Sequence, residues 1–213
     1  MNFDELVRLV GSLSWFDLAT LVQLTSERRK TIVTQLYRWI KTGKVIALRR
    51  GMYVLGEPYR RTAPSPAYLA NIIYRPSYLS GAWALSYFGM IPESVPVYTS
   101  VTTRKPRTFE NAFGTFRYQN IKASLFFGYE PLIIVGAKVL VARIEKALVD
   151  FFYLSRGEWT PARMREMRFS AHMEIDRGRL LEAVEKADTP RLRRAIRIWT
   201  DEMSDAARGV TEL

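Results

Sequence analysis

The sequence predicts an α+β protein, and three observations carry that prediction. The first sixty of its 213 residues hold three helical patterns and then two short apolar runs around a glycine turn. Strand-like alternation recurs between residues 97 and 141, whereas residues 156–213 carry helix-start signals and no strand pattern. We therefore expect an N-terminal unit ending in a hairpin, a central α+β unit with a small, mainly antiparallel sheet, and a helical tail.

The N-terminal elements follow from apolar spacing and turn residues. Helices are predicted over residues 2–11 and 17–22, and Thr25-Ser26 is a turn and cap signal before a third helix over 27–41. The apolar face expected for the third helix consists of Ile32, Val33, Leu36, Tyr37 and Ile40, with Trp39 at its edge. Residues 45–48 and 52–55 read as strands that flank the tight turn 49–51.

Three helices followed by a basic-tipped hairpin are typical of a winged helix-turn-helix, which we assign to residues 1–56. The outer face of the third helix carries the hydrogen-bonding groups that suit the major groove of double-stranded DNA. The candidate DNA-binding residues of this helix are Ser26, Arg28, Arg29, Lys30, Thr31, Thr34, Gln35, Arg38 and Lys41. Early positions are expected at base edges, Arg38 and Lys41 at phosphates, and Arg49 and Arg50 of the wing at flanking backbone or the minor groove.

Two other readings of this region stay open: a solvated amphipathic helix and a winged helix that binds protein. From Glu27 to Arg50 the chain has eight basic residues and Glu27 as its sole acid, whereas a solvated face normally mixes signs. DNA binding is therefore the favoured interpretation.

Residues 57–66 contain three prolines and no periodicity, so they read as a linker to a domain over 67–155. The elements expected in this domain are helices over 67–74, 80–88 and 144–154 and strands over 97–103, 114–119, 132–135 and 138–141. It also holds a possible second basic patch made of Arg75, Arg104, Lys105, Arg107, Arg117 and Lys122. If the strands pair, the arginines of the turn 103–107 and Arg117 share a face that contacts DNA or RNA; the alternative is scattered surface charge.

The amino-acid composition limits the classes of function that this chain can have. The chain has 32 Lys and Arg against 21 Asp and Glu, a formal charge of +11, which predicts attraction to polyanions. The absence of Cys and the single histidine, His172, exclude disulfide scaffolds, zinc fingers and thiol nucleophiles. We interpret His172 as structural, since no nucleophile elbow surrounds it.

The remaining signals do not favour an enzyme. No phosphate-binding glycine loop appears. Glu145 and Asp150 lie about 140° apart on their helix and do not converge on a cation, whereas Lys146 and Asp150 are spaced for an ordinary i, i+4 ion pair. We expect no catalytic residues, no metal and no cofactor.

The distribution of charge distinguishes the tail, residues 156–213, from the rest of the chain. Residues 1–60 and 61–155 each hold 10 basic and 5 acidic residues, whereas residues 156–213 hold 12 and 11. Helices are expected to start after Thr160 and Thr189, each followed by proline, and after Asp176. Their apolar stripes are Leu180, Leu181 and Val184, and then Leu192, Ile196 and Trp199. Packing on the central domain is favoured, with a dimer contact as the alternative.

No basic leader precedes an apolar stretch at the beginning of the sequence, and the apolar run 131–144 is broken by Lys138 and Arg143. We therefore expect no membrane association, a cytoplasmic location, and a monomer or weak dimer.

Several motif blocks occur in a fixed order: S-G-A-x-A-L-S (80–86), G-M-I-P-E (89–93), T-S-V-T (99–102), G-T-F-x-Y (114–118) and E-K-A-L-x-D (145–150). In this order, with G-M-Y-V-L-G at 51–56, the chain resembles the AbiEi family, the antitoxins of type IV toxin–antitoxin systems known for abortive phage infection. The resemblance covers about residues 1–155.

The resemblance implies two roles. The winged helix of such an antitoxin binds inverted repeats in the promoter of its own operon and represses it. The second domain counteracts a cognate nucleotidyltransferase-like toxin, typically without a stable complex. The alternative from another class is a winged-helix transcriptional regulator with a ligand- or partner-sensing domain and no toxin.

Overall fold

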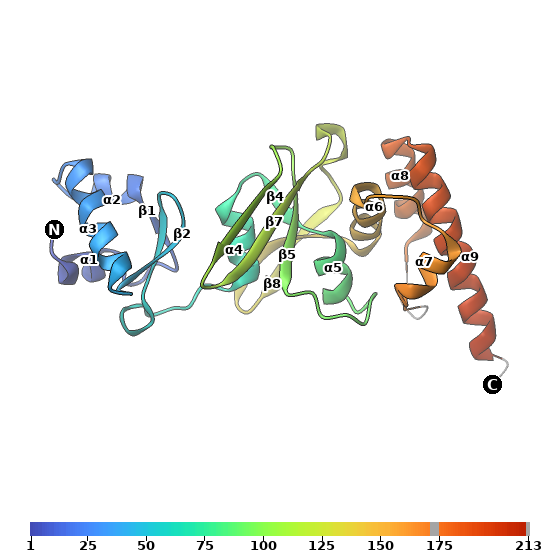
Figure 1. Ribbon diagram of the computed structural model, residues 1–213, viewed down its shortest axis with the longest axis horizontal. Coiled ribbons are helices and arrows are strands. Elements are labelled where there is room, and N and C mark those ends of the chain that lie inside the picture. Colours follow the sequence, from blue (N-terminus) through green and yellow to red (C-terminus); the bar gives the residue numbers. More distant parts are fainter. Residues whose placement is uncertain (171–174, 212–213) are drawn as a thin grey trace.

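The structure is a computed structural model that describes residues 1–170 and 175–211, with side chains described except for 206–211. Three parts follow one another along the long axis: an N-terminal unit, a central sheet, and a helical layer near the C-terminal end (Figure 1). The α+β class is confirmed.

The N-terminal unit contains the three expected helices, the hairpin, and one strand that the sequence analysis did not expect, β1. Its elements are α1 (Phe3–Val10), β1 (Phe16–Asp17), α2 (Leu18–Leu24), α3 (Arg29–Lys41), β2 (Val45–Arg49) and β3 (Met52–Leu55). The carboxylate of Asp17 caps α2 by accepting the backbone N–H of Thr20 at 2.7 Å. The strand order is β1-β3-β2, and β1 pairs antiparallel to β3.

Strand β3 is buried at every position because it is covered on both faces. Tyr53 and Leu55 belong to the core formed with α1, α2 and α3. Met52 and Val54 point the other way and belong to the core of the central sheet. The three-stranded sheet therefore lies between the N-terminal helices and the rest of the protein.

The segment expected as a linker joins parts that also touch each other directly. It begins with a short 3₁₀ helix, η1 (Glu57–Tyr59), and further along the backbone N–H of Arg61 donates to the carbonyl of Gly11 at 3.4 Å. Asn111 Nδ2 donates to the carbonyl of Leu48 at 3.1 Å. The hairpin is thus held against the central domain by side-chain contacts as well as by the chain connection.

The central sheet has six strands in the order β6-β7-β5-β4-β9-β8. Its elements are α4 (Pro66–Ile73), β4 (Ser77–Leu79), α5 (Gly81–Tyr87), β5 (Val97–Thr102), β6 (Arg107–Asn111), β7 (Gly114–Asn120), η2 (Ala123–Leu125), β8 (Tyr129–Ile134), β9 (Ala137–Ala142) and α6 (Ile144–Leu154). Three of its five strand pairs are antiparallel, as expected, but the sheet is larger than the sequence predicts. The pairs β4–β9 and β5–β7 are parallel, so the sheet is mixed, and β4 and β6 enlarge it.

Helices cover both faces of this sheet. On one face the hydroxyl of Tyr118 in β7 donates to the carbonyl of Ala70 in α4 at 2.7 Å. On the other, the hydroxyl of Tyr78 in β4 reaches Asp150 in α6. Asn71 of α4 uses its amide like a strand residue, exchanging hydrogen bonds with the backbone N–H and carbonyl of Leu140 in β9. That pairing continues the ladder where the short strand β4 does not reach.

The tail packs on the central domain, as favoured from the sequence. Helices α7 (Pro161–Glu166), α8 (Arg177–Ala187) and α9 (Pro190–Thr211) start where expected. Leu180, Val184, Leu192, Ile196 and Trp199 join the core that includes α6. Leu181 is a correction, because its side chain is exposed. Among the described helices, none is both long and apolar enough to cross a membrane.

Candidate functional site

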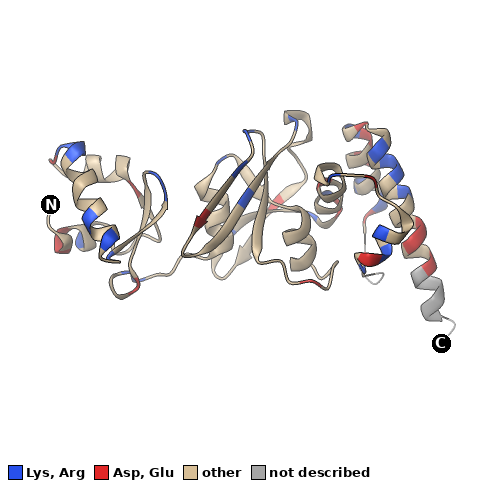
Figure 2. Ribbon diagram, viewed as in Figure 1, with Lys and Arg blue, Asp and Glu red and all other residues tan. Residues whose placement is uncertain are grey.

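The outer face of α3 carries most of the candidate DNA-binding residues. Ile32 and Leu36 are buried in the N-terminal core and orient the helix. The predicted side chains that the structure places in solvent are those of Ser26, Arg28, Arg29, Lys30, Thr31, Thr34, Arg38 and Lys41. Figure 2 shows the basic residues at both ends of this helix. Gln35 differs, since it is half-buried and its Oε1 is buried.

The apolar face of α3 is narrower than the sequence analysis expected. Val33 and Tyr37, which are expected on the apolar face, are 44% and 58% exposed. On a helix Val33 lies about 80° and Tyr37 about 120° from the centre of the Ile32–Leu36 stripe, so both fall outside it. Lys41 Nζ lies 4.7 Å from the centre of the Tyr37 ring. These two side chains add an apolar component to the basic, hydroxyl-bearing face.

The start of α3 also differs from the expectation. The helix begins at Arg29, its N-cap residue is Arg28, and no side chain caps its first turn. Ser26 is thus not the cap, and Thr25 instead uses its hydroxyl to donate to the carbonyl of Leu21 at the end of α2. Uncapped N–H groups beside two arginines form a local environment that favours an anion.

The hairpin tip is oriented differently from the expected wing. Arg49 Nε donates to the carbonyl of Ile73 at the end of α4 at 2.7 Å, and its Nη1 donates to the carbonyl of Arg50 at 3.0 Å. Arg49 is therefore engaged by the central domain rather than held out for DNA. Arg50 stays exposed at the turn.

The second basic patch is divided by the sheet. Arg107 pairs with Tyr118 and Thr108 pairs with Arg117 across β6 and β7. Directly opposed residues share a face and neighbours alternate, so Arg107 and Arg117 project to opposite faces. The expected common face of the turn arginines and Arg117 is therefore wrong. Lys105 and Lys122 are exposed outside the pocket described next.

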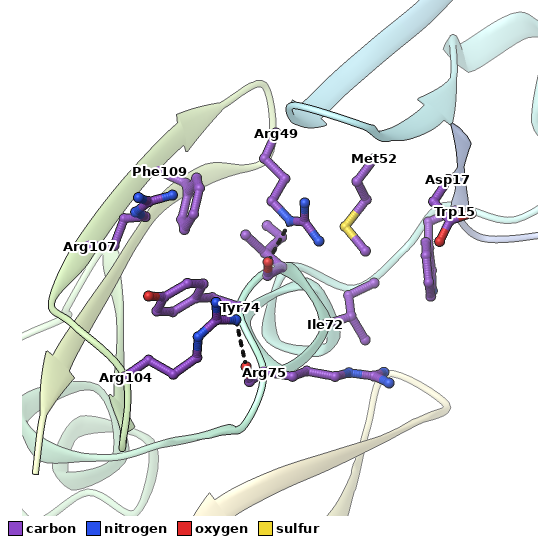
Figure 3. Close-up of a pocket in the computed structure, with 11 residues that line it drawn as sticks. Trp15, Asp17, Arg49, Met52, Ile72, Tyr74, Arg75, Arg104, Arg107 and Phe109 are labelled. Carbon is purple, nitrogen blue, oxygen red and sulfur yellow. Dashed lines mark hydrogen bonds between the residues drawn. The ribbon is translucent and has the colours of Figure 1, made fainter. Parts of the chain in front are cut away.

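Three arginines of the expected patch gather with Arg49 in a pocket between the N-terminal unit and the central domain. Its volume is about 460 Å³. The lining residues are Trp15, Asp17, Arg49, Met52, Ile72, Ile73, Tyr74, Arg75, Arg104, Arg107 and Phe109. Figure 3 shows that they come from the hairpin side and from α4 and the strand β6. Sequence reasoning found the cations of this pocket but missed its aromatic residues, which are far apart in the chain.

A separate polar cluster lies buried between β4 and α6. Asp150 accepts hydrogen bonds from Ser80 Oγ at 2.7 Å and from the Tyr78 hydroxyl at 3.0 Å, and it forms an ion pair with Lys146. The expected i, i+4 pair is confirmed. Glu145 points elsewhere and accepts the backbone N–H of Asp176 at 3.0 Å. The i, i+2 spacing of Tyr78 and Ser80 is the sequence signal that both would face one partner.

The electrostatics of this cluster follow from burial. Desolvation raises the pKa of Asp150, while the Lys146 ammonium and the hydroxyls of Ser80 and Tyr78 act in the opposite direction. Burial, together with the charge of Asp150, also raises the pKa of the Tyr78 phenol. Lys146 therefore supplies the charge that compensates a buried carboxylate, a structural role that ties α6 to β4.

His172 lies outside the described residues. No protein-family model matches the chain, and no curated protein matches it. The outer face of α3 and the arginine-lined pocket are thus the two candidate sites, and each rests on its own geometry.

Proposed function

We propose that the chain is a sequence-specific DNA-binding regulator and that its N-terminal unit is a winged helix. The observation that carries the proposal is the outer face of α3, where basic and hydroxyl side chains stand in solvent while Ile32 and Leu36 anchor the helix. The order α1-β1-α2-α3-β2-β3, with β1 antiparallel to β3, supports a winged-helix arrangement.

In this proposal α3 enters the major groove. Thr31 and Thr34 offer hydroxyl groups to base edges, and the exposed Val33 offers an apolar contact of the kind that recognises a thymine methyl group. Arg38 and Lys41, in the last turn, bind phosphates. Arg50 takes the role of the wing, because Arg49 is hydrogen-bonded to the central domain.

The number of basic residues on this surface limits how steeply the affinity for DNA can fall as the salt concentration rises. The basic residues available to phosphates are Arg28, Arg29, Lys30, Arg38, Lys41 and Arg50. If all of them neutralised phosphates, the slope of log K against log salt would be about −5 for each bound chain. Each lost phosphate contact would reduce that slope by about 1.

The test is DNA binding by an α3 variant and a charge-matched control. The double variant Arg28→Ala/Arg29→Ala is expected to lose binding to a duplex from the region upstream of its own gene, measured by fluorescence anisotropy. Arg194→Ala/Arg197→Ala removes the same two charges from exposed positions on α9 and should bind like the unmodified chain. Equal losses in both variants, or undiminished binding by the first, would exclude α3 as the recognition element.

We further propose, on the motif blocks from residue 80 to 150, that the regulator is an AbiEi-like antitoxin that represses its own operon. Co-expression with the adjacent gene tests this role. The chain should restore growth if that gene encodes a nucleotidyltransferase-like toxin, and Arg28→Ala/Arg29→Ala should restore it equally well. Absence of rescue by either form would favour the second candidate, a regulator that senses a ligand; the pocket at the junction supports that candidate.

A further inference from the structure

The pocket between the N-terminal unit and the central domain has the composition of a ligand site. Four guanidinium groups line it, from Arg49, Arg75, Arg104 and Arg107, while its one carboxylate belongs to Asp17. That carboxylate already accepts the N–H of Thr20 as the cap of α2. The cavity volume of about 460 Å³ lies within the range of about 300–1,000 Å³ that is usual for small-molecule sites.

The arginines keep donors available for an anion. Arg49 uses Nε and Nη1 on backbone carbonyls, and Arg104 uses Nη1 on the carbonyl of Arg75 at 3.1 Å. Arg75 uses Nε on the carbonyl of Asn71. The ion pairs found in the described part of the chain include none of these four guanidinium groups. All four side chains are exposed to solvent, so an anion can reach their unused donors and would reduce the repulsion between their like charges.

Aromatic rings stand beside these donors. The guanidinium of Arg104 lies 4.5 Å from the centre of the Tyr74 ring, and that of Arg107 lies 5.9 Å from the centre of the Phe109 ring. Trp15 lines the other side, where its indole N–H donates to the hydroxyl of Tyr68 at 3.3 Å. Figure 3 shows Tyr74 between Arg104 and the side chains of the hairpin. Tyr74 is buried, whereas Trp15 and Phe109 are partly exposed, so the site combines phosphate-binding donors with ring surfaces that a planar group can reach.

The position of the pocket separates it from the DNA-binding face proposed for α3. Met52 lines the pocket, whereas its neighbour Tyr53 packs toward α3 on the other face of the three-stranded sheet. A duplex seated on the outer side of α3 therefore has the N-terminal helices and this sheet between itself and the pocket. A ligand of the pocket would therefore be a molecule other than that duplex.

We propose that this pocket binds a nucleoside polyphosphate. Arg75, Arg104 and Arg107 would hold the phosphates, and the base would stack on a partly exposed ring, that of Trp15 or Phe109. Because the lining residues come from both the hairpin unit and the central domain, the bound nucleotide would link the two parts. This inference does not depend on DNA binding and is measured without DNA.

The experiment is isothermal titration calorimetry of the full chain with ATP, GTP, adenosine and inorganic tripolyphosphate. A nucleoside triphosphate should bind more tightly than either adenosine or tripolyphosphate, because each of these lacks one half of the recognised chemistry. Tripolyphosphate binding as tightly as ATP and GTP would overturn the stacking site for the base. Absence of heat with both nucleoside triphosphates at millimolar concentration, together with no displacement of a fluorescent nucleotide, would overturn the proposal entirely.

Two variants and a matched control locate the site. Arg104→Gln and Arg75→Gln should each weaken nucleotide binding by about tenfold or more, since each removes a charge-assisted contact. Arg117→Gln removes the same charge from the opposite face of the sheet, so it should leave binding unchanged. Thermal unfolding midpoints show that each variant is folded. An equal loss with Arg117→Gln would mean unspecific attraction of a polyanion to a basic protein, and the pocket assignment would fall.

Discussion

The buried ion pair between Lys146 and Asp150 makes a quantitative prediction about stability. Both side chains are less than 5% exposed, and the carboxylate also accepts hydrogen bonds from the hydroxyls of Ser80 and Tyr78. In the variant Asp150→Ala the Lys146 ammonium loses its counter-charge in a region that water does not reach. Removing one partner of a buried pair costs about 3–5 kcal/mol, because the other charge remains desolvated.

The same reasoning predicts a different result when both charges are removed. The double variant Lys146→Met/Asp150→Leu leaves no uncompensated charge, and apolar replacements of buried pairs are often neutral or stabilising. The hydroxyls of Ser80 and Tyr78 lose their acceptor in both variants, so the double variant should recover the part of the loss that comes from the uncompensated charge of Lys146. The double variant should be more stable than Asp150→Ala alone.

Urea unfolding followed by far-UV circular dichroism measures these differences. With a slope of about 2 kcal/mol per molar urea, a loss of 3–5 kcal/mol lowers the midpoint by about 1.5–2.5 M. Glu182→Ala is the matched control, because Glu182 and Lys186 form an i, i+4 pair at 2.6 Å that is exposed to solvent. It should leave the urea midpoint close to that of the unmodified chain, because an exposed ion pair contributes little to stability. Equal small losses for Asp150→Ala and Glu182→Ala would refute the reasoning from burial.

Two further predictions concern backbone conformation and pH. Gly128 and Gly136 share a φ of +72°, so alanine at Gly136 should lower the free energy of unfolding by about 1–2 kcal/mol. At Gly128 the added Cβ would also meet Lys146 Cγ at 3.0 Å, and the loss should be larger by about 1–3 kcal/mol. Equal shifts of the thermal midpoint in the two variants would contradict this. The hydrogen bond from Arg168 lowers the pKa of Glu93, so its contribution to stability is present above the unfolded pKa and is lost as pH falls through the folded pKa. An NMR titration should place the Glu93 pKa below its usual value, and Arg168→Ala should restore it; an unchanged titration in the variant would argue against the pairing.

Much of the local structure was predictable because its causes are local. Asp17, Thr160 and Asp176 each accept a backbone N–H in the first turn of the helix that follows, as cap residues do. The helix Ile144–Leu154 has the bounds that its apolar pattern predicts. Such elements depend on a few neighbouring residues, so their spacing in the sequence is sufficient.

What escaped prediction depends on contacts distant in sequence. Strand β6 lies at the edge of the sheet and carries few apolar residues, and β4 is only three residues long, with the side chain of Asn71 pairing with β9 beside it. Pattern reasoning therefore found neither strand. The parallel pairing of β5 with β7 was not expected either; it is possible because the chain passes through the edge strand β6 between them.

In the candidate site, too, the features with local causes were predictable and those that depend on distant contacts were not. The residues of the α3 face follow from helical spacing, but Val33 and Tyr37 are exposed because they lie to one side of the buried stripe of Ile32 and Leu36. Arg49 looked like a residue of a free wing, and only the folded chain brings the carbonyl of Ile73 within 2.7 Å of it. The sequence around an arginine in a turn does not indicate which distant carbonyl will accept its hydrogen bond.

The central claim, that the outer face of α3 binds DNA, is tested most directly by site-specific photocrosslinking. A photoreactive benzophenone side chain is placed at Thr34 on α3, and in a second protein at Leu181, an exposed position on α8. The account predicts that the probe at position 34 crosslinks to a duplex from the upstream region and that the probe at 181 does not. Crosslinking from position 181 with none from position 34, at saturating DNA, would contradict it.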